Sequence, residues 1–278
     1  MNEERKYRVM DCTRSMDLRT GEFVDSARTR IGGSHNGKIE YGHDCKSIYD
    51  YSNFGLLYVK QEPGVDSPYD DFVYHPSADE IELTLDGIAL MRYADGEGGP
   101  LVPGISTHIP AGLPHGNHHP GIDDLLLLVF YPKTVTEVGR AEHKMGEPYT
   151  GGKRHTMTNF QEAPAKEVAP GHFVANIHDG DQICMAYHRL TPGCSAPESD
   201  FVAHDTDEVV FVFRGSGVAT YADKTYQLHR DLAFYNPEGT PHRFMNNTDE
   251  DLHLIVFYTC NSPKDVKTVK KAIDADRF

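Results

Sequence analysis

Short apolar segments, separated by turns that contain glycine, proline or aspartate, recur along most of the chain. The segment VVFVFRG (209–215) is a nearly continuous apolar run that ends in glycine, which is typical of a buried strand. The segment IELTLDG (81–87) alternates apolar and polar residues and ends in Asp-Gly, a hairpin signal. Many short strands separated by such turns predict an all-β fold, either a sandwich or a barrel.

The pattern occurs twice along the chain. Residues 125–132 (LLLLVFYP) match residues 252–259 (LHLIVFYT) at an offset of 127, and YVKQEPG (58–64) matches YHRLTPG (187–193) at an offset of 129. Further matches at offsets of 127 and 128 lie between these segments: Pro110, Gly112 and His115 with Pro237, Gly239 and His242, and Glu80 and Gly87 with Glu208 and Gly215. An internal repeat of this kind predicts two tandem β-units.

The change in offset indicates a one-residue insertion in the first copy. The first copy reads HPSADE (75–80), and the second reads HDTDE (204–208). If the extra residue lies between histidine and glutamate, His75 and His204 are equivalent at an offset of 129. A one-residue bulge beside a functional site is an ordinary device in β-sheets.

The segments between and around the two copies are more polar. We predict an N-terminal extension at 1–50, a first unit at 51–135, a linker at 136–180, a second unit at 181–260 and a C-terminal helix at 261–278. The linker contains the loop-like pieces YTGGKRHT and EAPAKEVAPG. The helix is expected because Ser262 can cap it and Pro263 would lie in its first turn.

The repeated residues resemble the two sequence motifs of the cupin superfamily. Asp231 to Asn246 follows the second motif, G-x5-P-x-G-x2-H-x3-N, except that aspartate replaces the first glycine. Gly104 to His119 follows it as far as His115, with histidine in place of the final asparagine. The spacing H-x3-E-x6-G of the first motif is present in the second copy and, with the insertion, in the first. The resemblance implies two tandem cupin jelly-roll β-barrels.

The resemblance also implies a metal-ligand set in each copy. The usual first motif begins His-x-His, but Val73 and Val202 stand at the earlier position, so each copy offers two histidines and one glutamate. The expected ligands are His75, Glu80 and His115 in the first copy, and His204, Glu208 and His242 in the second. Three ligands leave about three open positions on an octahedral ion, which favours Fe²⁺ or Mn²⁺, although Zn²⁺ or Ni²⁺ would also accept them.

Two further residues are catalytic candidates. The segment PGISTHIPAGLPHG (103–116) resembles the histidine-rich loop of homogentisate dioxygenases, which implies that His108 is an acid/base helper. The alternative is that His118 and His119 are exposed loop residues. His119 and Asn246, which end the second motif, are expected to support the turn and not to contact substrate. Arg189 and Lys60 occupy equivalent strand positions, where either could meet a substrate carboxylate inside the barrel or could simply face solvent.

Composition narrows the class of function. A net charge of −15 argues against binding to nucleic acid. The longest apolar run has seven residues, 125–131, far short of the roughly 20 that span a bilayer. The charged start MNEERKYRVM does not look like a signal peptide, so we expect a cytoplasmic protein without a membrane partner. The five cysteines form no C-x-x-C pair and are expected to be buried or idle thiols.

These observations favour a metal-dependent enzyme that chelates a small phenolic, enolisable keto or 1,3-diketone-like substrate. A dioxygenase that cleaves a carbon–carbon bond is the leading hypothesis. An O₂-independent hydrolase or keto isomerase would use the same ligands, and a non-catalytic small-molecule-binding bicupin is the third alternative. A homo-oligomer is compatible with all three.

Overall fold

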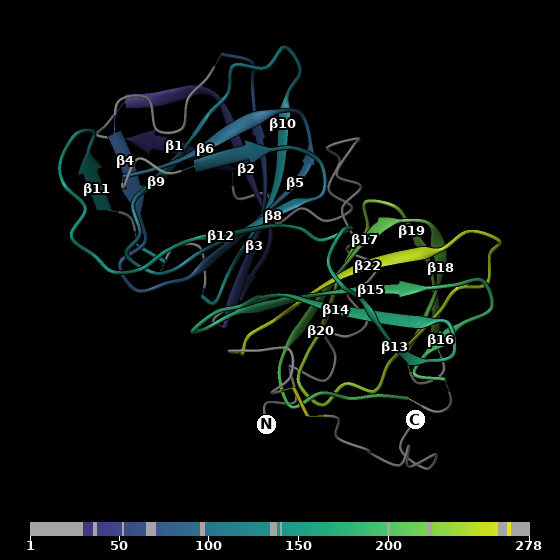
Figure 1. The fold of residues 1–278 in the computed structure, drawn as a ribbon. Helices are drawn as coiled ribbons and strands as arrows, with labels where there is room; N and C mark the ends of the chain where they lie inside the picture. The colour runs from purple at the N-terminus through teal and green to yellow at the C-terminus, as the bar shows by residue number, and fades with distance from the viewer. Residues whose placement is uncertain are drawn as a thin grey trace. The chain divides into compact units, whose positions relative to one another are not determined.

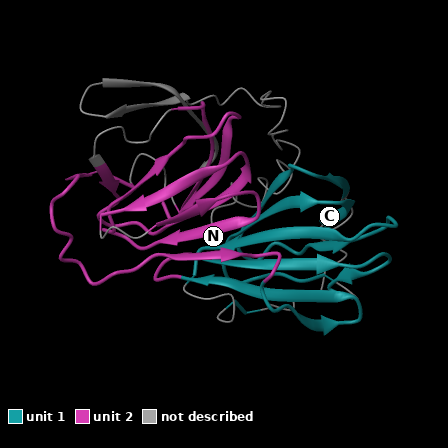
Figure 2. Ribbon diagram, turned by 45° about the horizontal axis from the view of Figure 1, so that its top comes forward, with its two compact units in different colours: residues 1–26, 163–179, 184–278 teal, residues 27–162, 180–183 magenta. Residues whose placement is uncertain are grey.

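The computed structural model describes residues 30–35, 38–51, 53–64, 71–94, 98–133, 138–139, 141–198, 201–221, 224–260 and 266–267. Every regular element in these residues is a β-strand, which agrees with the predicted all-β fold. The chain divides into two compact units, coloured in Figure 2. The N-terminal unit comprises residues 27–162 and 180–183, and the C-terminal unit contains residues 163–179 and 184–278. No helix among the described residues is long and apolar enough to cross a membrane.

The N-terminal unit consists of two antiparallel sheets (Figure 1). The larger sheet has the order β1-β2-β3-β10-β5-β8-β12, with the strands Arg30–His35, Lys38–Tyr51, Phe54–Gln61, Leu125–Tyr131, Glu80–Asp86, Ile105–Ile109 and Thr156–Asn159. The smaller sheet has the order β11-β4-β9-β6-β7, with the strands Ala141–Lys144, Asp71–Tyr74, His115–His118, Ala89–Tyr93 and Gly98–Leu101. Two packed antiparallel sheets of this kind form a jelly roll.

The C-terminal unit repeats the arrangement. Its larger sheet has the order β13-β14-β15-β22-β17-β20, with the strands Lys166–Ala169, His172–Asp179, Cys184–Leu190, Leu252–Tyr258, Glu208–Arg214 and Ala233–Asn236. Its smaller sheet has the order β16-β21-β18-β19, with the strands Ser195–Ala196, Arg243–Met245, Ser216–Tyr221 and Lys224–His229. In both units the last long strand, β10 or β22, lies at the centre of the larger sheet.

Strand registers in the two units agree with the sequence repeat. Val73 pairs with His115 in the N-terminal unit, and Val202 pairs with His242 in the C-terminal unit. The turn before the histidine is also repeated, because the carbonyl of His75 accepts a hydrogen bond from the Gly112 amide and that of His204 accepts one from the Gly239 amide, both at 2.8 Å. The inserted residue therefore lies between the histidine and the glutamate of the first copy.

The segments assigned to an extension and a linker contain strands. Strands β1 and β2 lie within residues 1–50 or run just beyond them, and strands β11 to β14 lie within 136–180 and extend both units. Several of these strands, such as β11 (AEHK) and β13 (KEVA), lie at sheet edges, where one side of the backbone lacks a partner strand. These strands were not predicted because they are polar and the prediction relied on apolar runs. The predicted C-terminal helix falls almost wholly outside the described residues.

A buried apolar cluster fills the space between the two sheets of each unit. In the N-terminal unit it joins residues of β10 to residues of β6 and other strands: Leu57, Val59, Ala89, Met91, Tyr93, Leu125, Leu127, Val129 and Tyr131 are among its members. In the C-terminal unit it includes Ala186, Leu190, Val210, Val212, Phe234, Phe244, Leu252, Leu254, Val256 and Tyr258. Alternate residues of each strand therefore point into the unit, as strand geometry requires.

Asp231, which replaces the first glycine of the second cupin motif, adopts the backbone conformation of a glycine. Asp231 has a φ of 68°, and the equivalent Gly104 has a φ of 95°. Aspartate is one of the few residues besides glycine that visit this left-handed region. The substitution thus keeps the backbone conformation that the motif needs.

The glycine that ends the first motif is more tightly constrained. Gly215 has a φ of 84°, and a Cβ atom on it would collide with the carbonyl oxygen of Asp251; Gly87 and Asp124 have the same relation in the other unit. We expect Gly215→Ala to destabilise the C-terminal unit by about 2–4 kcal/mol, because it adds a backbone clash to the left-handed strain. Thermal denaturation followed by circular dichroism measures the loss.

Gly193→Ala is the matched control. Gly193 has a similar φ of 78°, but nothing lies within 4 Å of an added Cβ atom. This substitution should cost only about 1–2 kcal/mol from backbone strain. An equal decrease in the free energy of unfolding for the two variants would show that the contact with Asp251 does not contribute to the cost.

Candidate metal centres

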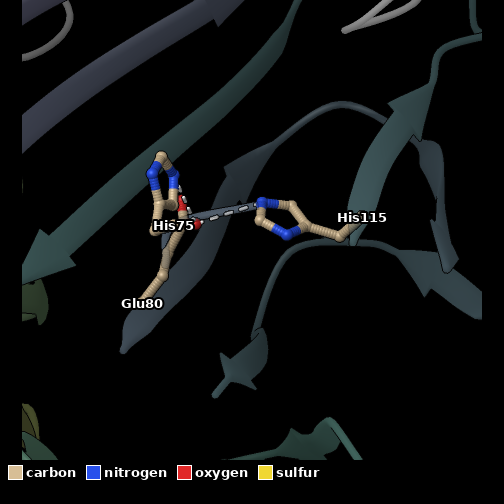
Figure 3. Close-up of side chains that lie close together, drawn as sticks. All are labelled: His75, Glu80 and His115. Carbon is tan, nitrogen blue, oxygen red and sulfur yellow. Dashed lines mark ion pairs between the residues drawn. The ribbon is translucent and has the colours of Figure 1, made fainter. Parts of the chain in front are cut away.

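Three of the predicted ligands meet inside the N-terminal unit. His75 follows strand β4, Glu80 begins β5, and His115 begins β9. Oε2 of Glu80 lies 3.1 Å from Nε2 of His115 and 3.3 Å from Nε2 of His75. Figure 3 shows both imidazole rings directed at the carboxylate. The three ligand atoms lie within 4.8 Å of one another, which is close enough to share one ion.

Contacts behind the rings determine which ring nitrogens can bind a cation. Nδ1 of His115 donates to the carbonyl of Leu113 at 2.9 Å, and Nδ1 of His75 donates to the carbonyl of Gly139 at 2.6 Å. Since a carbonyl can only accept, each neutral ring carries its proton on Nδ1 and directs the Nε2 lone pair at Glu80. Two lone pairs and a carboxylate facing one another is the arrangement that a bound cation stabilises.

His204, Glu208 and His242 form an equivalent group in the C-terminal unit. Nε2 of His242 lies 3.1 Å from Oε2 of Glu208, whereas Nε2 of His204 lies 3.9 Å from Oε1. Nδ1 of His242 donates to the carbonyl of Thr240 at 2.9 Å, as His115 does to Leu113 in the other unit. This group differs at two places: Asn236 donates to Oε2 of Glu208 at 2.6 Å, and Nδ1 of His204 has no hydrogen-bond partner among the described residues.

Electrostatics keeps both carboxylates in the form that binds metal. Burial by itself would raise the pKa of Glu80, but His115 and His75 in their protonated form supply positive charge and hydrogen bonds that hold that pKa well below its usual range, as a bound cation would. Burial likewise opposes ionisation of Glu208, and His242 and His204 lower its pKa in the same way. Both glutamates are therefore ionised at neutral pH.

The structure does not bring His108 to the metal-ligand group. His108 pairs with Ile81 on the neighbouring strand, so it lies on the sheet face opposite to Glu80. Its Nε2 lies 3.3 Å from Oδ2 of Asp79. The C-terminal unit has the same contact, in which the hydroxyl of Tyr235 donates to Asp207 at 3.2 Å. The predicted acid/base role requires the side chain of His108 to lie on the same sheet face as Glu80. The resemblance did not show which face His108 occupies, because it did not fix the strand register.

Arg189 is also directed away from the ligand group. It forms an ion pair with Asp251 at 2.9 Å, and its guanidinium carbon lies 4.2 Å from the centre of the Phe173 ring. The equivalent Lys60 pairs with Asp124 at 2.8 Å. Arg189 and Lys60 thus occupy equivalent positions, as predicted, but on the face that points out of the unit.

His119 is not in an exposed loop, but it supports the end of the second motif, as expected for this position. It is fully buried, and its Nδ1 donates to the carbonyl of Glu62 at 2.8 Å. The equivalent Asn246 donates to the carbonyl of Leu190 at 2.8 Å. Both side chains therefore connect the end of the second motif to the end of a strand in the larger sheet, β3 in the N-terminal unit and β15 in the C-terminal unit.

Two tyrosines beside the ligand groups were missed from the sequence. The hydroxyl of Tyr131 donates to Oε1 of Glu80 at 2.9 Å and lies 3.4 Å from Nε2 of His75. Burial, followed by the charge of Glu208, raises the pKa of the equivalent Tyr258 well above its usual value. The signal was present in VFY, the shared ending of the two matched segments 125–131 and 252–258.

Comparisons with known proteins identify the fold. Residues 186–258 match the family model of the cupin domain. No curated protein sequence matches the chain. Oxalate decarboxylase from Bacillus subtilis, in a structure at pH 4.6, is 15% identical, with a TM-score of 0.58 over 94% of this chain and 83% of that chain. A mutant of salicylate 1,2-dioxygenase from Pseudoaminobacter salicylatoxidans is 14% identical, with a TM-score of 0.61 over 74% and 70%.

At sequence identities of 14–15%, these structural matches establish only the similarity of the fold. They agree with the two jelly rolls, the internal repeat and the matched cupin segment. The more specific resemblance to homogentisate dioxygenases gains no support from them. Residues 186–258 thus form a cupin domain in the C-terminal unit, and the N-terminal unit repeats the same arrangement of strands.

Proposed function

We propose that this protein is a metal-dependent enzyme that acts on a small oxygenated substrate, with a divalent ion bound in each unit. The observation that carries the proposal is the repeated group of two imidazoles and one carboxylate, each group within 4.8 Å. Among the similar structures are a decarboxylase and a dioxygenase, which supports an enzymatic role for this fold.

The ligand types suit a hard or borderline divalent ion. Imidazole and carboxylate together accept Fe²⁺ or Mn²⁺, which we favour, and also Zn²⁺ or Ni²⁺. A bound ion of this type supplies Lewis acidity and open coordination positions for two substrate oxygens. His75, Glu80 and His115 would hold it in the N-terminal unit, and His204, Glu208 and His242 in the C-terminal unit.

The surrounding residues prepare the ligands for this task. The carbonyls of Leu113 and Thr240 fix the rings of His115 and His242, so neither ring has to reorient. The Tyr131 hydroxyl donates a hydrogen bond to Oε1 of Glu80, so that Oε2 faces the two imidazole rings. Burial of the glutamates keeps bulk water away from the negative charge and strengthens its interaction with a cation.

The leading reaction is oxidative cleavage of a carbon–carbon bond in a phenolic, enolisable keto or 1,3-diketone-like substrate. An O₂-independent hydrolysis or keto isomerisation would use the same ligand set. A non-catalytic small-molecule-binding bicupin is the remaining alternative. Neither His108 nor Arg189 enters this proposal, because both lie on the outward faces of their strands.

Metal content tests the proposal most simply. Wild-type protein purified without a metal-affinity tag should carry up to two equivalents of a divalent metal, measured by ICP-MS. His75→Ala and His204→Ala should each lose about one equivalent, because each removes one of three ligands. The controls His108→Ala and His253→Ala change buried or half-buried histidines outside the groups and should retain the metal. Wild-type protein that carries no metal and binds none on titration would contradict the proposal.

Tyr131 gives a test of the surrounding contacts. Tyr131→Phe removes the hydrogen bond to Glu80 and leaves the three ligands in place. We expect the metal affinity of the N-terminal unit to fall about 10-fold, in the range seen when a ligand loses its supporting hydrogen bond. Competition with a chelator, in a His204→Ala background that isolates this unit, measures the change. An unchanged affinity would show that the tyrosine only packs.

Oxygen dependence separates the leading reaction from its O₂-independent alternatives. A panel of 1,3-diketones and hydroxylated benzoates, tested in an oxygen electrode, should reveal a substrate that consumes one O₂ per molecule cleaved. Turnover should stop under argon and return when air is admitted. Unchanged turnover under argon would instead select the hydrolase or isomerase.

A further inference from the structure

The interiors of the two units differ in chemistry although their backbones correspond. Five buried polar residues of the N-terminal unit stand where the C-terminal unit has apolar ones: Gln61, Glu82, Thr84, Thr107 and Asn117, against Leu190, Val210, Val212, Phe234 and Phe244. The registers support this correspondence, because Glu82 pairs with Thr107 as Val210 pairs with Phe234. Each of these polar residues is at most 6% exposed.

The polar residues lie next to the metal-ligand group. Glu82 follows the ligand Glu80 by two residues on β5, and Asn117 follows the ligand His115 by two residues on β9. Since side chains alternate along a strand, each lies on the same face as its ligand and about 7 Å further along. Thr107 lies opposite Glu82 on β8, so these side chains form one patch inside the unit.

Several atoms of this patch lack hydrogen-bond partners. They are Oε2 of Glu82, Oγ1 of Thr84, Oγ1 of Thr107 and Oδ1 of Asn117. Burying such an atom without a partner costs about 1–3 kcal/mol. The C-terminal unit shows that the same backbone can be filled with valine and phenylalanine instead, so the polar residues are not needed for the fold. Apolar residues such as Leu57, Met91 and Leu127 are buried in the same unit, and a mixture of apolar and polar side chains is typical of small-molecule sites.

We infer that the N-terminal unit holds the substrate, and that Glu82, Thr84, Thr107 and Asn117 bind hydroxyl groups at the end of the substrate remote from its metal-chelating oxygens. The inference rests on the proposed function, because it assumes an ion at the adjacent ligands. Oε2 of Glu82 and Oδ1 of Asn117 can accept hydrogen bonds, although the Glu82 side chain also interacts with Glu80 and Asn117. Threonine hydroxyls both donate and accept. The substrate class they suit is a small polyhydroxylated keto acid.

Among the described residues, the C-terminal unit has apolar side chains at the positions equivalent to Glu82, Thr84, Thr107 and Asn117. Val210, Phe234 and Phe244 are packed into its apolar cluster. Oε2 of Glu208 already accepts a hydrogen bond from Asn236, which in turn accepts one from the Tyr221 hydroxyl at 2.6 Å. This unit would therefore bind its ion without taking the same substrate.

The test uses two six-carbon probes that share a carboxylate and a keto oxygen and differ only in hydroxyl groups, 2-oxogluconate and 2-oxohexanoate. Isothermal titration into Mn²⁺-loaded full-length protein should give at least about 10-fold tighter binding of the hydroxylated probe, which corresponds to roughly one well-made polar contact. Thr84→Val and Asn117→Leu should each reduce this preference severalfold. The matched control Val212→Thr, at the Thr84 position of the C-terminal unit, should leave it unchanged.

Stability measurements on the same variants guard against misfolding. Thr84→Val is nearly isosteric and removes a buried hydroxyl without a partner, so it should retain or raise the Tm. If the patch binds only buried water, the variants will alter the Tm and leave the preference between probes unchanged, which overturns the inference. Equal binding of both probes, or no binding of either, to metal-loaded protein also overturns it and leaves the metal sites standing. Absence of metal from the loaded samples would instead contradict the proposed function itself.

Discussion

The central constraint in this structure is the convergence of two imidazole nitrogens on one buried carboxylate. A buried glutamate without compensation is costly, and neutral imidazoles that present lone pairs to it do not remove that cost. The backbone nevertheless enforces this approach twice, through the pairs Val73–His115 and Val202–His242 and through the turn that precedes each histidine. A positive charge between the three side chains removes this cost, and the divalent cation that we propose would supply it.

The sequence was sufficient to predict the repeat, the all-β class and which histidines and glutamates lie close together in each unit, because these depend on spacing within short strand-turn-strand segments. It failed where the outcome depended on which face of a strand a residue occupies. His108 and Arg189 have suitable chemistry but face away from the ligands, and a shift of one residue in register would have reversed that result. Tyr131 was missed for a related reason, since its role depends on a strand far away in the sequence.

Edge strands were also not predicted from the sequence. Segments such as AEHK and KEVA add to the sheets by backbone hydrogen bonds and carry few apolar side chains. Asp231 shows the opposite case, in which an apparent departure from a motif preserves the backbone conformation. The two units have thus kept one backbone and one ligand arrangement while their interiors diverged, with polar side chains in the N-terminal unit and apolar packing in the C-terminal unit.

Anomalous diffraction from crystals grown with Mn²⁺ tests the central claim most directly. The account predicts one anomalous peak among Nε2 of His75, Nε2 of His115 and the Glu80 carboxylate, and a second among the equivalent atoms of His204, His242 and Glu208. Metal-loaded crystals in which both positions lack a peak, or in which manganese binds only at surface carboxylates, would contradict it.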